Sequence, residues 1–67
     1  MVTDILSGAR VGPFIVFKDA DGKRHAVRHG AIMSVSEDED DVVSIAMTGN
    51  RTALVRQAFD RVLSWFR

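Results

Sequence analysis

Two histidines, four residues apart, are the first candidates for chemistry in this chain. His25 and His29 have the spacing that places two zinc ligands on one face of a helix. They lie, however, in a stretch from Lys23 to Gly30 that reads as a β-strand, where four residues separate side chains by more than about 10 Å. No Glu stands between them. We therefore predict that both histidines are exposed residues of a sheet and that they bind no metal.

A second candidate is the segment Asp19-Ala-Asp-Gly22, whose residues match the opening of a calcium-binding loop. Such loops place further oxygen ligands at fixed positions and end with a Glu. Here Lys23, Arg24 and His25 follow, and no Glu stands at the expected distance. The segment has the residues of a tight turn, in which Gly22 is free to adopt a positive φ. We predict a turn there and no calcium site.

Five consecutive acids, Glu37, Asp38, Glu39, Asp40 and Asp41, are the third candidate. Carboxylates act as general acids or bases when burial shifts their pKa, whereas a run of five like charges cannot sit in a core. We therefore expect a loop exposed to water. The sequence also has no Gly-rich phosphate loop, no Ser or Cys nucleophile motif and no Tyr. We predict a protein that is not an enzyme and uses no cofactor.

The acidic run is better suited to recognition than to catalysis. Successive carboxylates on a small rigid domain can imitate phosphates and dock into a basic groove of a nucleic-acid-binding protein. A loop that only keeps the protein soluble is the simpler interpretation of the run, and we favour it over mimicry of phosphates. Trp65 is a further candidate contact, because it lies at the margin of an apolar helical face, where an aromatic side chain can anchor a partner. The candidate partner-binding residues are therefore Glu37–Asp41 and Trp65.

The elements that position these residues are organised around the C-terminal segment Thr52–Arg67. From Leu54 onward its residues divide a helical wheel into a polar half and an apolar half. The apolar half is centred on Val55, Phe59, Val62 and Phe66. Two starts are open: a short strand over Thr52–Val55 followed by a helix from about Arg56, or a longer helix that begins directly after the preceding turn. We favour the short strand.

Upstream, the sequence has the residues of a sheet. Phe14–Lys18 is rich in residues that favour strands, and Lys23–Val27 returns after the turn as the second arm of a hairpin. Ala31–Ser36 and Val42–Met47 are the next strands. The strand Phe14–Lys18 is apolar on both faces, unlike a strand that is buried on one side only. We expect the helix to cover one face, and either the N-terminal arm or a second copy of the protein to cover the other.

These elements predict an α+β fold. Residues 1–12 are expected to form a short turn or an N-terminal arm. Residues 13–67 are expected to form a single ββββα domain, in which a small antiparallel β-sheet of three to four strands has one C-terminal amphipathic helix packed on one face. A domain of 67 residues buries only about 60% of the surface that its unfolded chain exposes. A partner chain is one way to stabilise so small a core, and we expect a homodimer.

Composition limits the compartment and the partners. No apolar run approaches the ~18 residues that span a bilayer, the N-terminus lacks a signal-peptide pattern, and there is no Cys. We expect a cytoplasmic protein with no membrane partner. Nine Lys and Arg balance nine Asp and Glu, and the Arg residues near the C-terminus scatter around the helical wheel. Because non-specific nucleic-acid binders rely on a basic surface, we do not expect direct binding to nucleic acid.

Six short motifs follow one another along residues 14–66. They are Asp21-Gly22-Lys23, His29-Gly-Ala-Ile32, Ser36-Glu37, Asp41-Val-Val-Ser-Ile45, Thr48-Gly49 and Phe59-Asp60-Arg61-Val62-Leu63. Together with the order of the elements, they resemble the small FlbD-like proteins associated with flagella and swarming motility. The resemblance implies no catalytic residue, because that family has no catalytic motif.

The sequence therefore predicts a non-enzymatic, small protein-binding adaptor or regulator whose partner is another protein. The alternative is a phage or mobile-element inhibitor, similar to anti-CRISPR proteins, that occludes a nucleic-acid-binding protein through its acidic loop.

Overall fold

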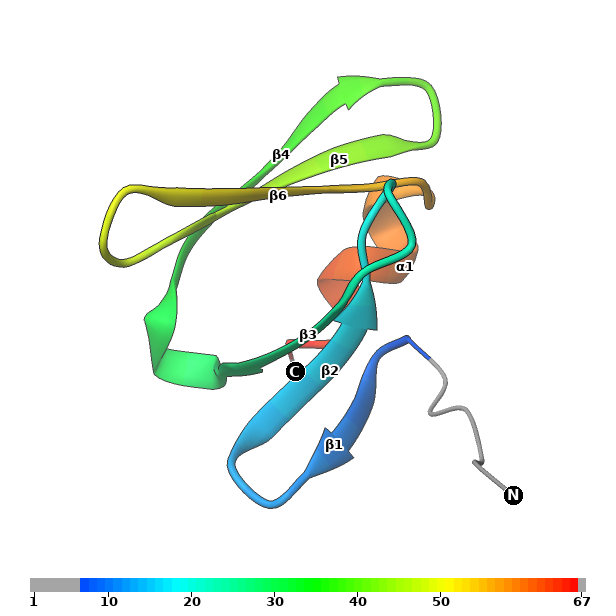
Figure 1. The fold of residues 1–67 in the computed structure, drawn as a ribbon. Coiled ribbons are helices and arrows are strands. Elements are labelled where there is room, and N and C mark those ends of the chain that lie inside the picture. Colours follow the sequence, from blue (N-terminus) through cyan, green and yellow to red (C-terminus); the bar gives the residue numbers. More distant parts are fainter. Residues whose placement is uncertain (1–6, 67) are drawn as a thin grey trace.

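A computed structural model describes residues 7–66 and arranges them as two small sheets and one short helix (Figure 1). The elements are β1 (Ala9–Val11), β2 (Phe14–Lys18), β3 (Arg24–Arg28), the 3₁₀ turn η1 (His29–Ala31), β4 (Ile32–Glu39), β5 (Val42–Met47), β6 (Arg51–Val55) and α1 (Phe59–Ser64). The strands form two antiparallel sheets in the orders β1-β2-β3 and β4-β5-β6. The prediction of a small α+β fold is confirmed.

The strands are more numerous than the three to four expected, and they are divided between two sheets. β1 adds an edge to the first sheet, where Ala9 pairs with Val16 and Val11 pairs with Phe14. This strand lies within the segment expected to be an arm, and it is too short to show an alternating pattern in the sequence. After β3, the turn η1 redirects the chain into β4, so that the first hairpin and the following three strands form separate sheets.

A backbone hydrogen bond joins the first hairpin to the second sheet. The N–H of Ala20, in the turn after β2, donates to the carbonyl oxygen of Leu54 in β6 at 2.7 Å. A second bond extends the pairing of β4 with β5, since the N–H of Thr48, directly after β5, donates to the carbonyl oxygen of Ala31, directly before β4, at 2.9 Å. It thereby anchors the turn η1 to the second sheet.

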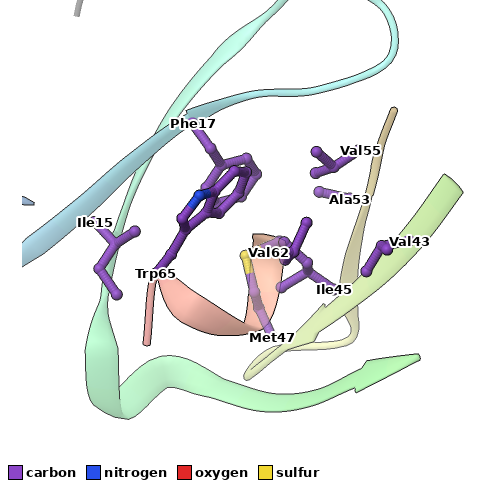
Figure 2. Packing of buried hydrophobic residues seen from close by; sticks show 9 residues of the cluster. All are labelled: Ile15, Phe17, Val43, Ile45, Met47, Ala53, Val55, Val62 and Trp65. Atoms are coloured by element: carbon purple, nitrogen blue, oxygen red, sulfur yellow. The ribbon is translucent and has the colours of Figure 1, made fainter. Parts of the chain in front are cut away.

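The hydrophobic core lies between the inner faces of the two sheets (Figure 2). Alternation along each strand produces these faces, because successive side chains of a strand point to opposite sides. β5 shows this most clearly, with buried residues at every second position. The core consists of Ile15, Phe17, Val43, Ile45, Met47, Ala53, Val55, Val62 and Trp65.

The C-terminal helix is shorter than the helical wheel suggests. Residues up to Val55 belong to β6, which confirms the predicted short strand, and α1 begins only at Phe59. Val55 is held in the sheet by its pairing with Val43 of β5. Leu54 consequently faces outward from the sheet and remains 44% exposed, although the wheel placed it on the apolar face. Within α1 the buried residue is Val62.

Trp65, just after α1, connects the C-terminal segment to the first sheet. Its side chain is 8% exposed and stacks on Phe17 of β2, with ring centroids 6.0 Å apart and an interplanar angle of 21°. Its carbonyl oxygen accepts a hydrogen bond from Nη2 of Arg10 at 3.1 Å. A side chain at Gly8 would overlap the indole, since a Cβ built there collides with Cδ1 and Nε1 of Trp65.

We predict that Gly8→Ala destabilises the protein more than Gly12→Ala does. Both glycines have positive φ, 92° and 57°, so Ala is strained at either position by about 1–2 kcal/mol. At Gly12 nothing lies within 4 Å of the added Cβ, whereas at Gly8 it collides with Trp65. Overpacking should add roughly 1–3 kcal/mol at Gly8 alone. Urea unfolding of both variants measures the difference.

The chain has one tryptophan, so fluorescence reports directly on this contact. The emission of Trp65 should shift in Gly8→Ala and stay unchanged in Gly12→Ala. Equal losses of stability in the two variants would show that Gly8 is needed only for its backbone conformation.

Candidate functional site

The acidic run forms the tip of the β4–β5 hairpin, and all five acids are exposed, as predicted. The loop itself is shorter than expected. Glu37, Asp38 and Glu39 belong to β4, because Glu37 pairs with Val43 and Glu39 pairs with Val42. Only Asp40 and Asp41 form the turn, where Asp41 adopts a φ of 59°. The acids therefore project from a hydrogen-bonded hairpin instead of a flexible loop.

One side of this hairpin tip faces the start of α1. The pairing of Glu37 with the buried Val43 directs Glu37 toward the core side of the sheet, at its open end. A shallow depression of about 440 Å³ lies there between hairpin and helix. It is lined by Glu37, Asp40, Asp41, Ala58, Phe59 and Asp60. Four acidic residues and one half-buried aromatic residue thus line the same depression.

Phe59 and Asp60 are residues that sequence reasoning did not connect with the acidic run. Nothing in the sequence shows that the start of α1 lies beside a turn some twenty positions earlier. The arrangement suits a Lys or Arg side chain, whose aliphatic stem can lie along the ring while its charged head lies among the carboxylates.

The negative charge of the hairpin is not neutralised within the described part of the chain. Within residues 7–66, an ion pair joins His25 to Asp19, and no ion pair joins any acid of Glu37–Asp41 to another described residue. Uncompensated surface charge of one sign attracts partners of the opposite sign and speeds their association. The hairpin is therefore an exposed anionic surface with an apolar centre.

Trp65, the other candidate contact, lies in the core. The wheel placed it at the margin of the apolar face, but this margin faces the first sheet, where the indole stacks on Phe17. With 8% of the residue exposed, the indole mainly stabilises this chain. Trp65 does not line the depression beside the hairpin.

The two histidines have different partners. Nε2 of His29 donates to the carbonyl oxygen of Phe66 at 2.8 Å, whereas Nε2 of His25 donates to Oδ2 of Asp19 at 2.7 Å. Among the described residues there is no group of three or more His, Cys, Asp or Glu that could hold a metal ion.

Asp19 organises the predicted turn, which the structure confirms. Its Oδ1 accepts hydrogen bonds from the backbone N–H groups of Asp21 and Lys23, both at 2.9 Å, and Gly22 has a φ of 83°. The hydrogen bond from His25 and these two N–H groups stabilise the carboxylate and lower the pKa of Asp19 below its ordinary value of 3.8.

We predict that Asp19→Asn removes a pH-dependent part of the stability. Because the pKa of Asp19 is lowered in the folded chain, its ionised form stabilises the fold above the ordinary pKa, and this contribution disappears as the pH falls through the lowered pKa. The difference in unfolding free energy between wild type and variant should be largest well above pH 3.8 and should shrink as the pH falls below it.

Urea unfolding at several pH values measures this difference. Asp21→Asn is the matched control, since it makes the same charge change in the same turn at an exposed side chain. A difference between wild type and Asp19→Asn that stays constant over this pH range would contradict the role of the carboxylate.

Comparisons with known proteins identify no relative. No family model matches the chain, and neither a curated protein nor a solved structure is significantly similar to it. Within residues 7–66, no helix is long and apolar enough to cross a membrane. The resemblance to FlbD-like proteins therefore stays a prediction. The surfaces of this chain are the remaining source of information on its function.

Proposed function

We propose that the protein is a non-enzymatic adaptor or regulator that binds another protein through its acidic hairpin. The observation that carries this proposal is the depression beside the hairpin, which Glu37, Asp40, Asp41 and Asp60 line together with Phe59. A basic segment of a partner fits this surface in both charge and shape, because Lys and Arg combine an apolar stem with a cationic head.

The hairpin supports binding better than catalysis. A carboxylate that transfers protons near neutral pH needs burial or a close like charge in a closed site, so that its pKa rises. The acids at this tip are exposed, and water solvates them. Exposed charges of one sign act instead at long range, by steering a partner of opposite sign.

A second candidate function uses the same surface. A phage or mobile-element inhibitor would present its carboxylates to the phosphate-binding groove of a nucleic-acid-handling protein. The position of Glu37–Glu39 in β4, with a register shift at Asp38, favours this possibility, because a hydrogen-bonded hairpin holds charges in a fixed array at little entropic cost. The two functions differ in whether nucleic acid competes with the protein for the partner.

We predict that neutralising the hairpin abolishes partner binding. The variant replaces Glu37–Asp40 by Ser and Asp41 by Asn, since Asn tolerates the positive φ at that position. The immobilised wild type should retain specific proteins from a lysate of its native cells, and the variant should retain them at least about tenfold less. Quantitative mass spectrometry measures the ratio.

Single substitutions serve as matched controls. Asp40→Asn should weaken capture, and Asp21→Asn should not, because Asp21 is an exposed acid in the turn between β2 and β3. Release of the captured protein by an oligonucleotide would select the inhibitor over the adaptor. Capture that survives both the hairpin variant and high salt would exclude this surface altogether.

We also propose that the protein forms a homodimer through an apolar groove between β4 and α1. The exposed large apolar side chains of the described chain are Val11, Met33, Leu54 and Leu63. Met33 and Leu63, 71% and 46% exposed, line the same groove of about 270 Å³, and its lining contains no Asp, Glu, Lys or Arg. A two-fold contact there brings no like charges together.

This contact would use side chains and not strand pairing. The edge of β4 is interrupted by register shifts at Met33 and Asp38, and Glu37 points toward the core side. Bulges and inward-pointing charges are devices that prevent an edge strand from pairing with another chain.

We predict that the wild type sediments with twice the chain mass of 7.4 kDa and that Met33→Ser with Leu63→Ser is monomeric. Leu54→Ser is the control, because Leu54 has an exposure similar to that of Leu63 but does not line the groove. Sedimentation velocity over a dilution series measures the mass. A monomeric wild type, or an equal effect of Leu54→Ser, would exclude this dimer.

A further inference from the structure

The strand register gathers basic side chains on the outer face of the first sheet. Ile15 and Phe17 of β2 point into the core, so Phe14, Val16 and Lys18 point away from it. The register of β3 against β2 pairs these three with residues of β3 that also point outward. The pairs are Phe14 with Arg28, Val16 with Ala26 and Lys18 with Arg24. We call these six residues the basic face.

A groove runs over the basic face. Its volume is about 680 Å³, its floor includes Val11, Phe14, Val16 and Ala26, and Lys23 and Arg24 line its rim. Val11 is 49% exposed, so apolar surface is accessible at one end of the groove. The groove therefore combines an apolar floor with cationic edges.

Two planar groups lie together at the far end of β3. The guanidinium carbon of Arg28 lies 5.5 Å from the centre of the Phe14 ring, in a cation–π arrangement. Phe14 is half-buried and Arg28 is exposed. Aromatic rings and Arg guanidinium planes are the groups on which proteins stack unpaired bases.

The charge of the basic face indicates an anionic occupant. Lys18, Arg24 and Arg28 are exposed, and no Asp or Glu belongs to the face. A two-fold contact with a second copy through this face would place cations against cations, which is unfavourable. The same residues attract a polyanion.

We propose that the basic face binds single-stranded nucleic acid. Such a ligand offers phosphates to the cations and flat apolar bases to the groove floor and to Phe14, and it therefore matches both features at once. Arg24 and Arg28 are about 13 Å apart along β3, so the face offers cations to separate phosphates of one strand.

The expectation from the sequence that the chain does not bind nucleic acid rests on its net charge of zero. Net charge does not decide binding at this face. The acids that balance the cations belong largely to the hairpin of the other sheet, and the basic face points away from that sheet. At physiological salt, charges are screened over about 8 Å.

Fluorescence anisotropy with a labelled oligothymidylate and a labelled oligouridylate tests the proposal. The wild type should bind both, and three to four phosphate contacts should give a slope of about −2 to −3 for the logarithm of the affinity against the logarithm of the salt concentration. Arg24→Ser with Arg28→Ser should weaken binding at least about tenfold and reduce the magnitude of that slope by about 1.4.

Two further variants separate charge from stacking. Arg51→Ser with Arg61→Ser removes the same charge from exposed positions outside the basic face and should change the affinity less than about twofold. Phe14→Leu keeps an apolar floor but removes the ring, and should weaken binding roughly tenfold without altering the salt slope. Circular dichroism confirms that each variant is folded.

Three results would overturn the proposal. The first is no binding of either oligonucleotide by the folded wild type at low salt. The second is an equal loss of affinity in the Arg51 and Arg61 control, which would mean that only net charge matters. The third is polyglutamate binding as tight as oligonucleotide binding together with an unaffected Phe14→Leu variant. This last result would assign the basic face to an acidic segment of a protein.

Discussion

The stack of Trp65 on Phe17 is the contact on which the rest of this small structure depends. Each three-stranded sheet has an apolar inner face that must be covered, and the two inner faces meet in one core. α1 is a six-residue helix that buries only Val62. The indole extends that short helix across to the first sheet, so that one C-terminal segment covers both inner faces. The close approach of Gly8 shows that the space around the indole is filled from the N-terminal side as well.

Local patterns in the sequence were sufficient for much of the fold. The hairpin around Asp19–Gly22 has the turn residues that this geometry requires, and β5, a predicted strand, alternates between buried and half-buried residues. The C-terminal segment was ambiguous, because Leu54 and Val55 fit both a helical wheel and a strand. The pairing of Val55 with Val43 resolves that ambiguity, and such a contact between distant residues is not encoded in local periodicity.

In the candidate site, too, some features could be predicted from local sequence and others depend on contacts between distant residues. Exposure of the acidic run follows from the cost of burying five like charges, and it could be predicted without a structure. Its neighbours could not, because Phe59 reaches the hairpin only through the path of the chain around the core. The interpretation of Trp65 as a partner contact depended on its place at the margin of the helical wheel. Its backbone is still helical, with φ −67° and ψ −23°, and the indole packs on Phe17 of the first sheet, a neighbour that no helical wheel can show.

The register of strand pairing also decides which charged residues gather on one surface. Lys18, Arg24 and Arg28 are spread over eleven residues of a chain whose total charge is zero, and no count of charges brings them together. They share a face only because Lys18 pairs with Arg24 and Phe14 pairs with Arg28. A slip of one residue in β3 would turn Arg24 and Arg28 toward the core and His25 and Val27 outward. The turn held by Asp19, with three hydrogen bonds to its carboxylate, sets this register. A polar contact within the turn thereby determines both that the core is apolar and that the opposite face is basic.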